Sequence, residues 1–368
     1  MSRRTQRTNR RLPYNTAEPT WANDLRVGAG AASLFSWHRA ENNITLSTSM
    51  AGFGSSPPTV TLGGTRTQPY PIRIDCDGSG ILGTATFRWS LDEYGSTYEG
   101  TGILTSGSPV ALGTTGATVT FGAGTYTAYN KDSLTGHKWQ SAVESWSDMT
   151  GRAGCIINNS AVVASTSCLY ERYGINGDGF TRASILGSPG ILGNQSALAT
   201  MPSGAATPFH AFCVAQVVNL PTLTNTLALF GWQSTTQAAK EIIDLFVTGP
   251  TTVTVLDAWG VQRINTAATI QRVNSTQADA VTRLRPDIAP HVFEMEYTGT
   301  TVFFRIDGTL VGTVAWSGSC ACDRFPLFGL KLAGGAAGSF LVARISDFVL
   351  YSAALSASDA ASVRLRLA

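Results

Sequence analysis

Residues 290–316 read PHVFEMEYTGTTVFFRIDGTLVGTVAW, and their pattern indicates the fold class. It contains three runs in which apolar residues alternate with others, at 292–297, 301–306 and 309–316. Alternation with a period of two predicts β-strands. The dipeptide Asp307-Gly308 between the last two runs suits the positive φ angles of a tight type I′ turn. The stretch therefore predicts an antiparallel sheet.

The same pattern extends through most of the chain. Alternating runs separated by Gly, Asn, Asp, Ser and Pro recur about every 8–12 residues, which is typical of β-sandwiches and barrels. Further strands are predicted at 59–62, 72–76, 85–90, 118–121, 212–218, 252–256 and 341–351. The sequence predicts an all-β fold.

Helix is predicted at two places only. Residues 237–246 form a weak candidate. The second helix is at the C-terminus, where Ser356 can cap the backbone and Asp359 favours the first turn. Its apolar residues Val363, Leu365 and Leu367 are expected to pack on a sheet.

Composition gives a neutral body with a basic end. The chain has 368 residues, which fits one large or two ordinary domains. With 43% hydrophobic residues it can form a core, which excludes intrinsic disorder. The net charge is +2, yet the first eleven residues hold five arginines and no acid: Arg3, Arg4, Arg7, Arg10 and Arg11. We predict a basic N-terminal arm over residues 1–30.

The arm has three interpretations. It docks on an acidic neighbouring protein, it contacts packaged DNA through phosphates, or it is a solubilising tail. Five arginines give only salt-sensitive phosphate binding, so we favour docking over DNA contact.

Two segments far apart in the sequence resemble the opening of one domain family. The first is SWHRAE at 36–41 followed by ITL at 44–46, and the second is VESWSDMTG at 143–151. Together they resemble a concanavalin-A-like (laminin-G-like) jelly-roll domain, with Glu41 and Thr150 in place of the usual Asp and Ser. Residues 173–177, 291–308 and 345–356 continue the pattern in order. The resemblance implies a sandwich over 31–49 and 139–368, interrupted by a small inserted β domain over 50–138.

The combination of a jelly roll and such an insertion resembles structural proteins of tailed-bacteriophage virions. This resemblance implies a non-enzymatic decoration, neck, tail or fibre component, assembled in the host cytoplasm and anchored through its arm to other virion structural proteins. A homo-oligomer is expected. No apolar run is long enough to span a bilayer and no signal peptide is recognisable, so no membrane partner is expected. No cofactor is expected either.

The alternative function is a carbohydrate-binding module on the virion surface that assists adsorption to a host glycan. Aromatic rings can bind sugars by stacking. Tyr94 and Tyr98 lie in a Gly-containing turn and are the candidate glycan contacts.

A further alternative is a glycan hydrolase that uses Glu294 and Glu296. Residues i and i+2 of a strand point to one face, and two carboxylates about 5 Å apart suit a retaining glycosidase. Some glucanases of this fold have a third acid on that strand, where this chain has Val292. The interpretation that we favour is a solvent-facing strand edge whose two charges oppose aggregation.

Metal binding is weakly indicated. The run DCDGSG at 75–80 is similar to the start of a calcium loop, but its twelfth position is Thr86 and not a carboxylate. NGDG at 176–179 is a second candidate. We interpret both as turns and expect no bound metal. The six scattered cysteines are expected to be free thiols in a cytosolic setting.

Overall fold

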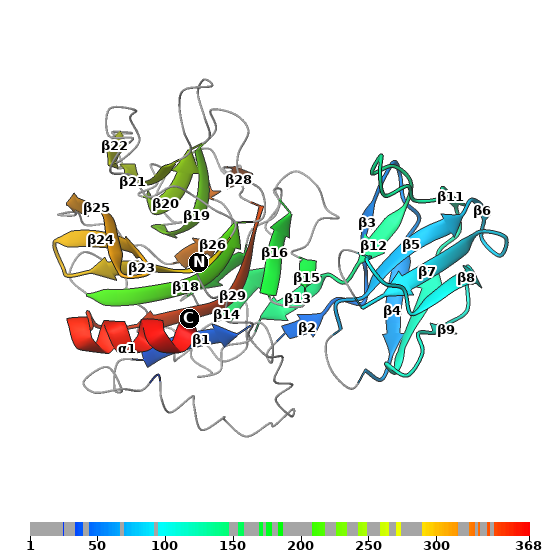
Figure 1. The fold of residues 1–368 in the computed structure, drawn as a ribbon, viewed down its shortest axis with the longest axis horizontal. Helices are drawn as coiled ribbons and strands as arrows, with labels where there is room; N and C mark the ends of the chain where they lie inside the picture. The colour runs from blue at the N-terminus through cyan, green and yellow to red at the C-terminus, as the bar shows by residue number, and fades with distance from the viewer. Residues whose placement is uncertain are drawn as a thin grey trace, which may run out of the picture.

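The computed structural model describes residues 25, 34–39, 44–66, 70–91, 95–146, 154–157, 169–171, 174–178, 183–186, 208–217, 226–233, 242–248, 258–264, 270–273, 289–315, 324–327, 330–331, 337–338 and 342–368. These residues are almost entirely β-strands (Figure 1). The predicted all-β fold is therefore confirmed.

An eight-stranded antiparallel sheet forms one layer of the sandwich. Its order is β15-β16-β29-β18-β23-β24-β25, and β1 also pairs with β29. The bounds are β1 (Leu34–Arg39), β15 (Leu169–Glu171), β16 (Gly174–Asp178), β18 (Phe209–Val217), β23 (Pro290–Tyr297), β24 (Thr301–Ile306), β25 (Thr309–Ala315) and β29 (Val342–Tyr351).

A seven-stranded antiparallel sheet forms the second layer, in the order β14-β17-β26-β19-β20-β21-β22. Its bounds are β14 (Gly154–Ile157), β17 (Ala183–Leu186), β19 (Thr226–Gln233), β20 (Ile242–Thr248), β21 (Ala258–Ile264), β22 (Ile270–Val273) and β26 (Arg324–Leu327). The short strands β27 (Leu330–Lys331) and β28 (Ala337–Gly338) pair with each other.

The β24–β25 hairpin turns as predicted. Asp307 has φ 49° and Gly308 has φ 81°, so both central residues take the positive angles of a type I′ turn. The side chain of Asp307 also accepts the backbone N–H of Val292 at 2.8 Å, which ties the turn to β23.

The α-helix among the described residues is α1 (Ala357–Leu367), which packs on the outer face of the eight-stranded sheet. Ser356 caps it by accepting the backbone N–H of Asp359 at 3.1 Å, as predicted. Val363 is fully buried, whereas Leu365 is 82% exposed, so its predicted packing is wrong. Positions two apart cannot share one face of a helix with a 3.6-residue turn.

Leu25 lies inside the predicted arm but belongs to the core next to α1. It is 2% exposed and packs in a hydrophobic cluster with sheet and helix residues. Tyr351 donates its hydroxyl to the carbonyl oxygen of Leu25 at 2.8 Å. The chain is therefore fixed to the sandwich at residue 25. The rest of the arm, with Arg3, Arg4, Arg7, Arg10 and Arg11, lies outside the described residues.

The insertion holds three small sheets. The largest has the order β3-β12-β5-β7-β8, the second is β4-β10-β9, and the third is β11-β6. Their bounds are β3 (Ala51–Phe53), β4 (Val60–Gly64), β5 (Arg73–Gly78), β6 (Gly80–Ile81), β7 (Thr86–Ser90), β8 (Gly100–Leu104), β9 (Val110–Ala111), β10 (Ala117–Phe121), β11 (Thr125–Tyr126) and β12 (Lys138–Gln140).

One hydrophobic cluster serves the insertion alone. All its buried members fall between Met50 and Trp139, and its fully buried aromatic rings include Phe87 and Phe121, 4.7 Å apart. In Figure 1 strands β3 to β12 lie at the end of the molecule away from α1. That residues 50–138 fold as an independent domain remains a prediction.

Two paired strands join the insertion to the sandwich. β2 (Ile44–Leu46) leads out and β13 (Val143–Trp146) leads back, and they pair antiparallel with Leu46 opposite Val143. Ser47 N–H donates to the Ala142 carbonyl at 2.9 Å just beyond this pair. The ends of the inserted segment therefore lie side by side, as a tolerated insertion requires.

Three local predictions need correction. The segment predicted as a helix at 237–246 contains the start of β20, which lies between β19 and β21. Residues 75–78 belong to β5 and 176–178 to β16, so these segments are strands and not turns. The predicted strand at 252–256 lies outside the described residues. No helix in the described part of the chain is long and apolar enough to cross a membrane.

Candidate functional site

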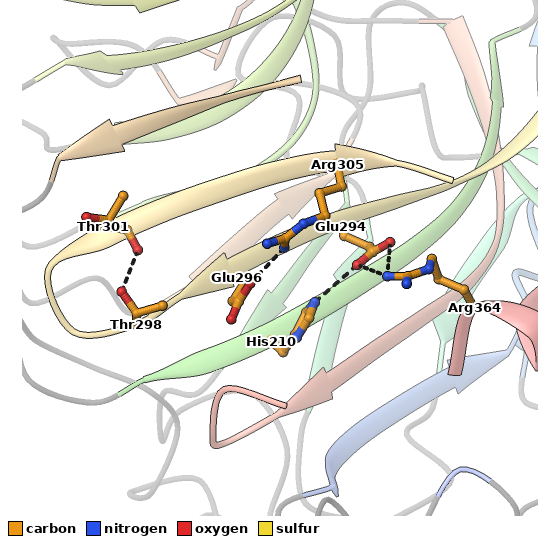
Figure 2. A network of polar contacts seen from close by, with 7 residues as sticks. All are labelled: His210, Glu294, Glu296, Thr298, Thr301, Arg305 and Arg364. Atoms are coloured by element: carbon orange, nitrogen blue, oxygen red, sulfur yellow. Dashed lines mark hydrogen bonds and ion pairs between the residues drawn. The ribbon is translucent and has the colours of Figure 1, made fainter. Parts of the chain in front are cut away.

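The predicted carboxylate pair lies inside the eight-stranded sheet. β23 is hydrogen-bonded to β18 on one side and to β24 on the other, and Glu294 is 0% exposed. The interpretation of Glu294 and Glu296 as a solvent-facing strand edge is therefore wrong. The helix α1 packs over this part of the sheet, and its Arg364 side chain contacts Glu294 (Figure 2).

Each of the two carboxylates accepts hydrogen bonds from an arginine side chain. Arg364 donates through Nη1 to both oxygens of Glu294, at 3.0 and 2.9 Å, and His210 Nε2 lies 3.3 Å from Oε2. Arg305 Nη1 donates to Glu296 at 2.7 Å (Figure 2). A glycosidase needs carboxylates that reach the sugar. Glu294 is instead closed off from solvent and held in an ion pair that fastens α1 to the sheet.

Histidine 210 completes this buried network. Its ring stacks on Phe212, with centroids 4.4 Å apart and an interplanar angle of 13°. Its Nδ1 atom is buried and has no hydrogen-bond partner among the described residues. One ring nitrogen of His210 therefore faces Glu294, while the ring packs against Phe212.

A second polar cluster lies in the insertion, around Asp75 of β5. Arg73 donates to both carboxylate oxygens, at 2.8 and 3.0 Å, and Tyr98 donates its hydroxyl at 2.6 Å. Arg88 Nη2 lies 3.8 Å from the same carboxylate. Asp75 is 0% exposed, so these partners offset the cost of burying its charge. Burial, followed by the hydrogen bond to Asp75, raises the pKa of Tyr98 to about 12.

Cations and aromatic rings are layered over this cluster. Arg88 lies over the ring of Tyr98 at 4.2 Å, and Arg73 lies over Tyr129 at 5.3 Å. Lys138 Nζ lies 4.9 Å from the Phe53 ring and 5.5 Å from that of Tyr129. Such cation–π contacts hold positive charge at a partly exposed surface.

Strand register places this cluster on one face. Lys138 is opposite both Phe53 and Asp75, and Asp75 is opposite Arg88, so their side chains share a face. The neighbouring positions Ile74, Trp139 and Phe87 belong to the hydrophobic cluster on the other face. We call the face that carries Phe53, Lys138, Asp75 and Arg88 the polar face of the insertion.

Of the two predicted glycan contacts, Tyr94 and Tyr98, the structure describes Tyr98. Tyr98 is half-buried on the polar face, with its hydroxyl used by Asp75. Tyr94 lies outside the described residues. Asp75, the first residue of the predicted calcium loop, belongs to the same cluster. Its carboxylate is bound by Arg73 and is therefore not free to bind a cation. Among the described residues, no group of three or more His, Cys, Asp and Glu side chains could hold a metal ion.

Sequence reasoning missed the cationic partners. Arg73, Asp75 and Asp77 alternate with the apolar Ile74 and Cys76, and this alternation was the available signal for a polar face. The partners of Glu294 gave no such signal, because they come from distant parts of the chain.

Comparisons with known proteins give no family. No family model matches the chain, and no curated protein matches it. Among solved structures, the binding domain of botulinum neurotoxin DC in complex with SialylT matches with TM-score 0.37 and 9% identity, over 61% of this chain and 49% of that one. The binding domain of Paraclostridial Mosquitocidal Protein 1 matches with TM-score 0.38 and 7% identity, over 60% and 49%.

A smaller domain is similar over a different share of the chain. The CBM40 of the Ruminococcus gnavus IT-sialidase, bound to alpha2,3 sialyllactose, matches with TM-score 0.33 and 12% identity, over 47% of this chain and 89% of that one. This chain spans about half the length of the two toxin binding domains.

Proposed function

We propose that this chain is a non-enzymatic, carbohydrate-binding protein in which the insertion presents the binding surface and the sandwich is the scaffold. The observation that carries the proposal is the polar face of the insertion. It presents the partly exposed cations Arg88 and Lys138 beside the partly exposed rings of Tyr98 and Phe53, which are the kinds of side chain that hydrogen-bond and pack against sugars.

The arrangement of the joining strands supports this division of roles. β2 and β13 are paired, so the insertion can be held out from the sandwich without disturbing either large sheet. The non-enzymatic part of the proposal is supported by Glu294 and Glu296, each of which is held in an ion pair with an arginine.

The test removes the insertion. Because Leu46 and Val143 are direct partners, an Asn-Gly turn can join them in place of residues 47–142. The full chain is expected to bind host-cell surface polysaccharide in a sedimentation assay, and the variant without the insertion is expected to bind at background level. Circular dichroism of the variant serves as the folding control. Equal binding by a folded variant would place the ligand elsewhere and refute the proposal.

A second candidate is a structural subunit of a phage particle, anchored by its basic arm and present as a homo-oligomer on the virion. The fixing of Leu25 beside α1 favours it, because the arm then starts from a rigid point on the sandwich. Removal of residues 1–24 spares Leu25 and is expected to abolish incorporation into particles. Quantitative mass spectrometry of gradient-purified particles measures this. Normal copy number after truncation would contradict anchoring by the arm.

A further inference from the structure

We propose that the polar face of the insertion binds a glycan whose sugars carry carboxylates, with Lys138 and Arg88 as the groups that contact the acid. The inference rests on the proposed carbohydrate-binding function and names its ligand class. It starts from a straight row of side chains across four strands. The members of the row, each the register partner of the next from β3 through β12 and β5 to β7, are Phe53, Lys138, Asp75 and Arg88.

The row presents cations to solvent, while its carboxylate is buried. Lys138 is partly exposed and 27% of the Arg88 side chain is exposed, whereas Asp75 is 0% exposed. Lys138 and Arg88 lie on the two strands that flank β5, so their Cα atoms are about 10 Å apart. A ligand that approaches the row from solvent therefore meets two positive charges.

The charge of Asp75 is already balanced by a different arginine. Arg73 is 4% exposed and donates to both oxygens of Asp75, at 2.8 and 3.0 Å, and Tyr98 donates its hydroxyl at 2.6 Å. Arg88 Nη2 lies 3.8 Å from the same carboxylate, which is longer than a hydrogen bond. Arg88 is therefore paired less closely with Asp75 than Arg73 is.

Two other acidic groups lie close to the row. Burial, followed by the hydrogen bond to Asp75, raises the pKa of Tyr98 to about 12, so its phenol carries no charge at neutral pH. The Asp77 carboxylate accepts the Gly102 N–H through Oδ2 at 2.9 Å, and its Oδ1 atom is buried. Asp77 is therefore turned towards the edge strand β8 and away from the row.

Aromatic rings hold the two cations in place. The Arg88 guanidinium lies over the Tyr98 ring at 4.2 Å, and Lys138 Nζ lies 4.9 Å from the Phe53 ring. A long side chain that is already ordered loses less conformational entropy when a ligand binds. Both rings are also partly exposed, so they can contact the apolar C–H surface of a sugar whose carboxylate lies on the cation.

These features favour an acidic sugar over a neutral one. Hydrogen bonds from Arg or Lys to a carboxylate are about twice as strong as those between neutral groups. A neutral sugar would use neither charge. An acidic polysaccharide repeats its carboxylates along the chain, so one molecule can contact both cations. Single-stranded nucleic acid also combines anions with flat rings, and the experiment includes it as a competing ligand.

The first test changes the ligand and leaves the protein intact. The probe is the host-cell surface polysaccharide of the sedimentation assay, before and after its carboxylates are reduced to primary alcohols with carbodiimide and borohydride. The full chain is expected to bind the untreated polymer and to bind the reduced polymer about tenfold more weakly. Binding to the untreated polymer should also weaken as sodium chloride rises from about 0.05 to about 0.5 M.

The second test changes the two cations. Lys138→Gln and Arg88→Gln should each weaken binding about fivefold, whereas Lys138→Arg and Arg88→Lys keep the charge and should bind within about twofold of the unmodified chain. The matched control is Lys131→Gln, which removes an exposed lysine of the insertion outside the row and should leave binding unchanged. Melting temperatures show whether each variant folds, and the first test needs no variant.

Three results would overturn the ligand class. The reduced polymer binds as tightly as the untreated one, both glutamine variants bind as tightly as the Lys131→Gln control, or the full chain prefers a single-stranded oligothymidylate to the polymer. Each of these leaves the proposed function standing when deletion of residues 47–142 still abolishes polysaccharide binding. The proposed function itself fails when the folded variant without the insertion still binds, and both fail when the full chain does not bind the untreated polymer.

Discussion

At the scale of single residues, two fully buried carboxylates in the described part of the chain are neutralised in the same way. Asp75 and Glu294 are both 0% exposed, and each has both oxygens bonded to one arginine. A buried carboxylate that loses its arginine keeps the desolvation cost without the attraction. The two arginines should therefore be far more sensitive to substitution than exposed ones.

Arg364→Ala tests this at the sandwich. It leaves Glu294 buried with His210 as its neighbour, and we expect the free energy of unfolding to fall by about 3 kcal/mol. Arg366→Ala on the exposed side of α1 is the control and should change it by less than about 0.5 kcal/mol. Urea denaturation followed by circular dichroism measures both. Replacing both members, Glu294→Leu with Arg364→Leu, should recover much of the loss. Equal effects of the two single alanine variants would contradict the ion-pair interpretation.

At the scale of elements, the sequence predicts structure well where local chemistry decides it. The type I′ turn at Asp307-Gly308 and the Ser356 cap follow from residues within four positions of each other, and both are confirmed. The helix predicted at 237–246 is wrong over 242–246, where the residues pair with strands on both sides, and its first half lies outside the described residues. Strand pairing across the sheet outweighs the local preference for helix.

The two candidate sites also differ in how far the sequence predicts them. The polar face could be anticipated from the alternation of charged and apolar residues in 73–77. The partners of Glu294 could not, because His210 and Arg364 stand 84 and 70 positions away in the chain. Only the completed sheet and the docked helix bring them together.

Two glycines of the insertion distinguish the free-energy cost of a positive φ angle from the cost of a steric clash. Gly83 and Gly136 have nearly equal positive φ angles, 87° and 88°. A Cβ at Gly83 would meet nothing within 4 Å, whereas one at Gly136 would collide with the backbone carbonyl of Ala128. Gly83→Ala should therefore cost about 1–2 kcal/mol through conformation alone. Gly136→Ala should cost clearly more, because the backbone itself must move. Urea denaturation monitored by tryptophan fluorescence would compare them, and equal losses would contradict the contact.

At the scale of the whole molecule, the described residues include one hydrophobic cluster in the insertion and another between the large sheet and α1, and the paired strands β2 and β13 join these two parts. One cluster is built from residues 50–139 and another from the outer face of the large sheet, α1 and Leu25. Neither cluster contains a residue of the other, so each is expected to survive without its neighbour. If each part packs by itself, the insertion can carry the proposed binding surface while the sandwich keeps its packing.

The corresponding prediction is that residues 47–142 fold when expressed alone. Their ends lie next to each other, since Ser47 N–H donates to the Ala142 carbonyl at 2.9 Å, so excision leaves no long strained connection. The fragment should unfold cooperatively in urea, with Trp139 passing from a 1% exposed environment to water. In the full chain, the same fluorescence transition should occur at nearly the same urea concentration as in the fragment. A fragment without a cooperative transition would mean that the sandwich is needed to hold the insertion together, and the two clusters would then form a single folding unit.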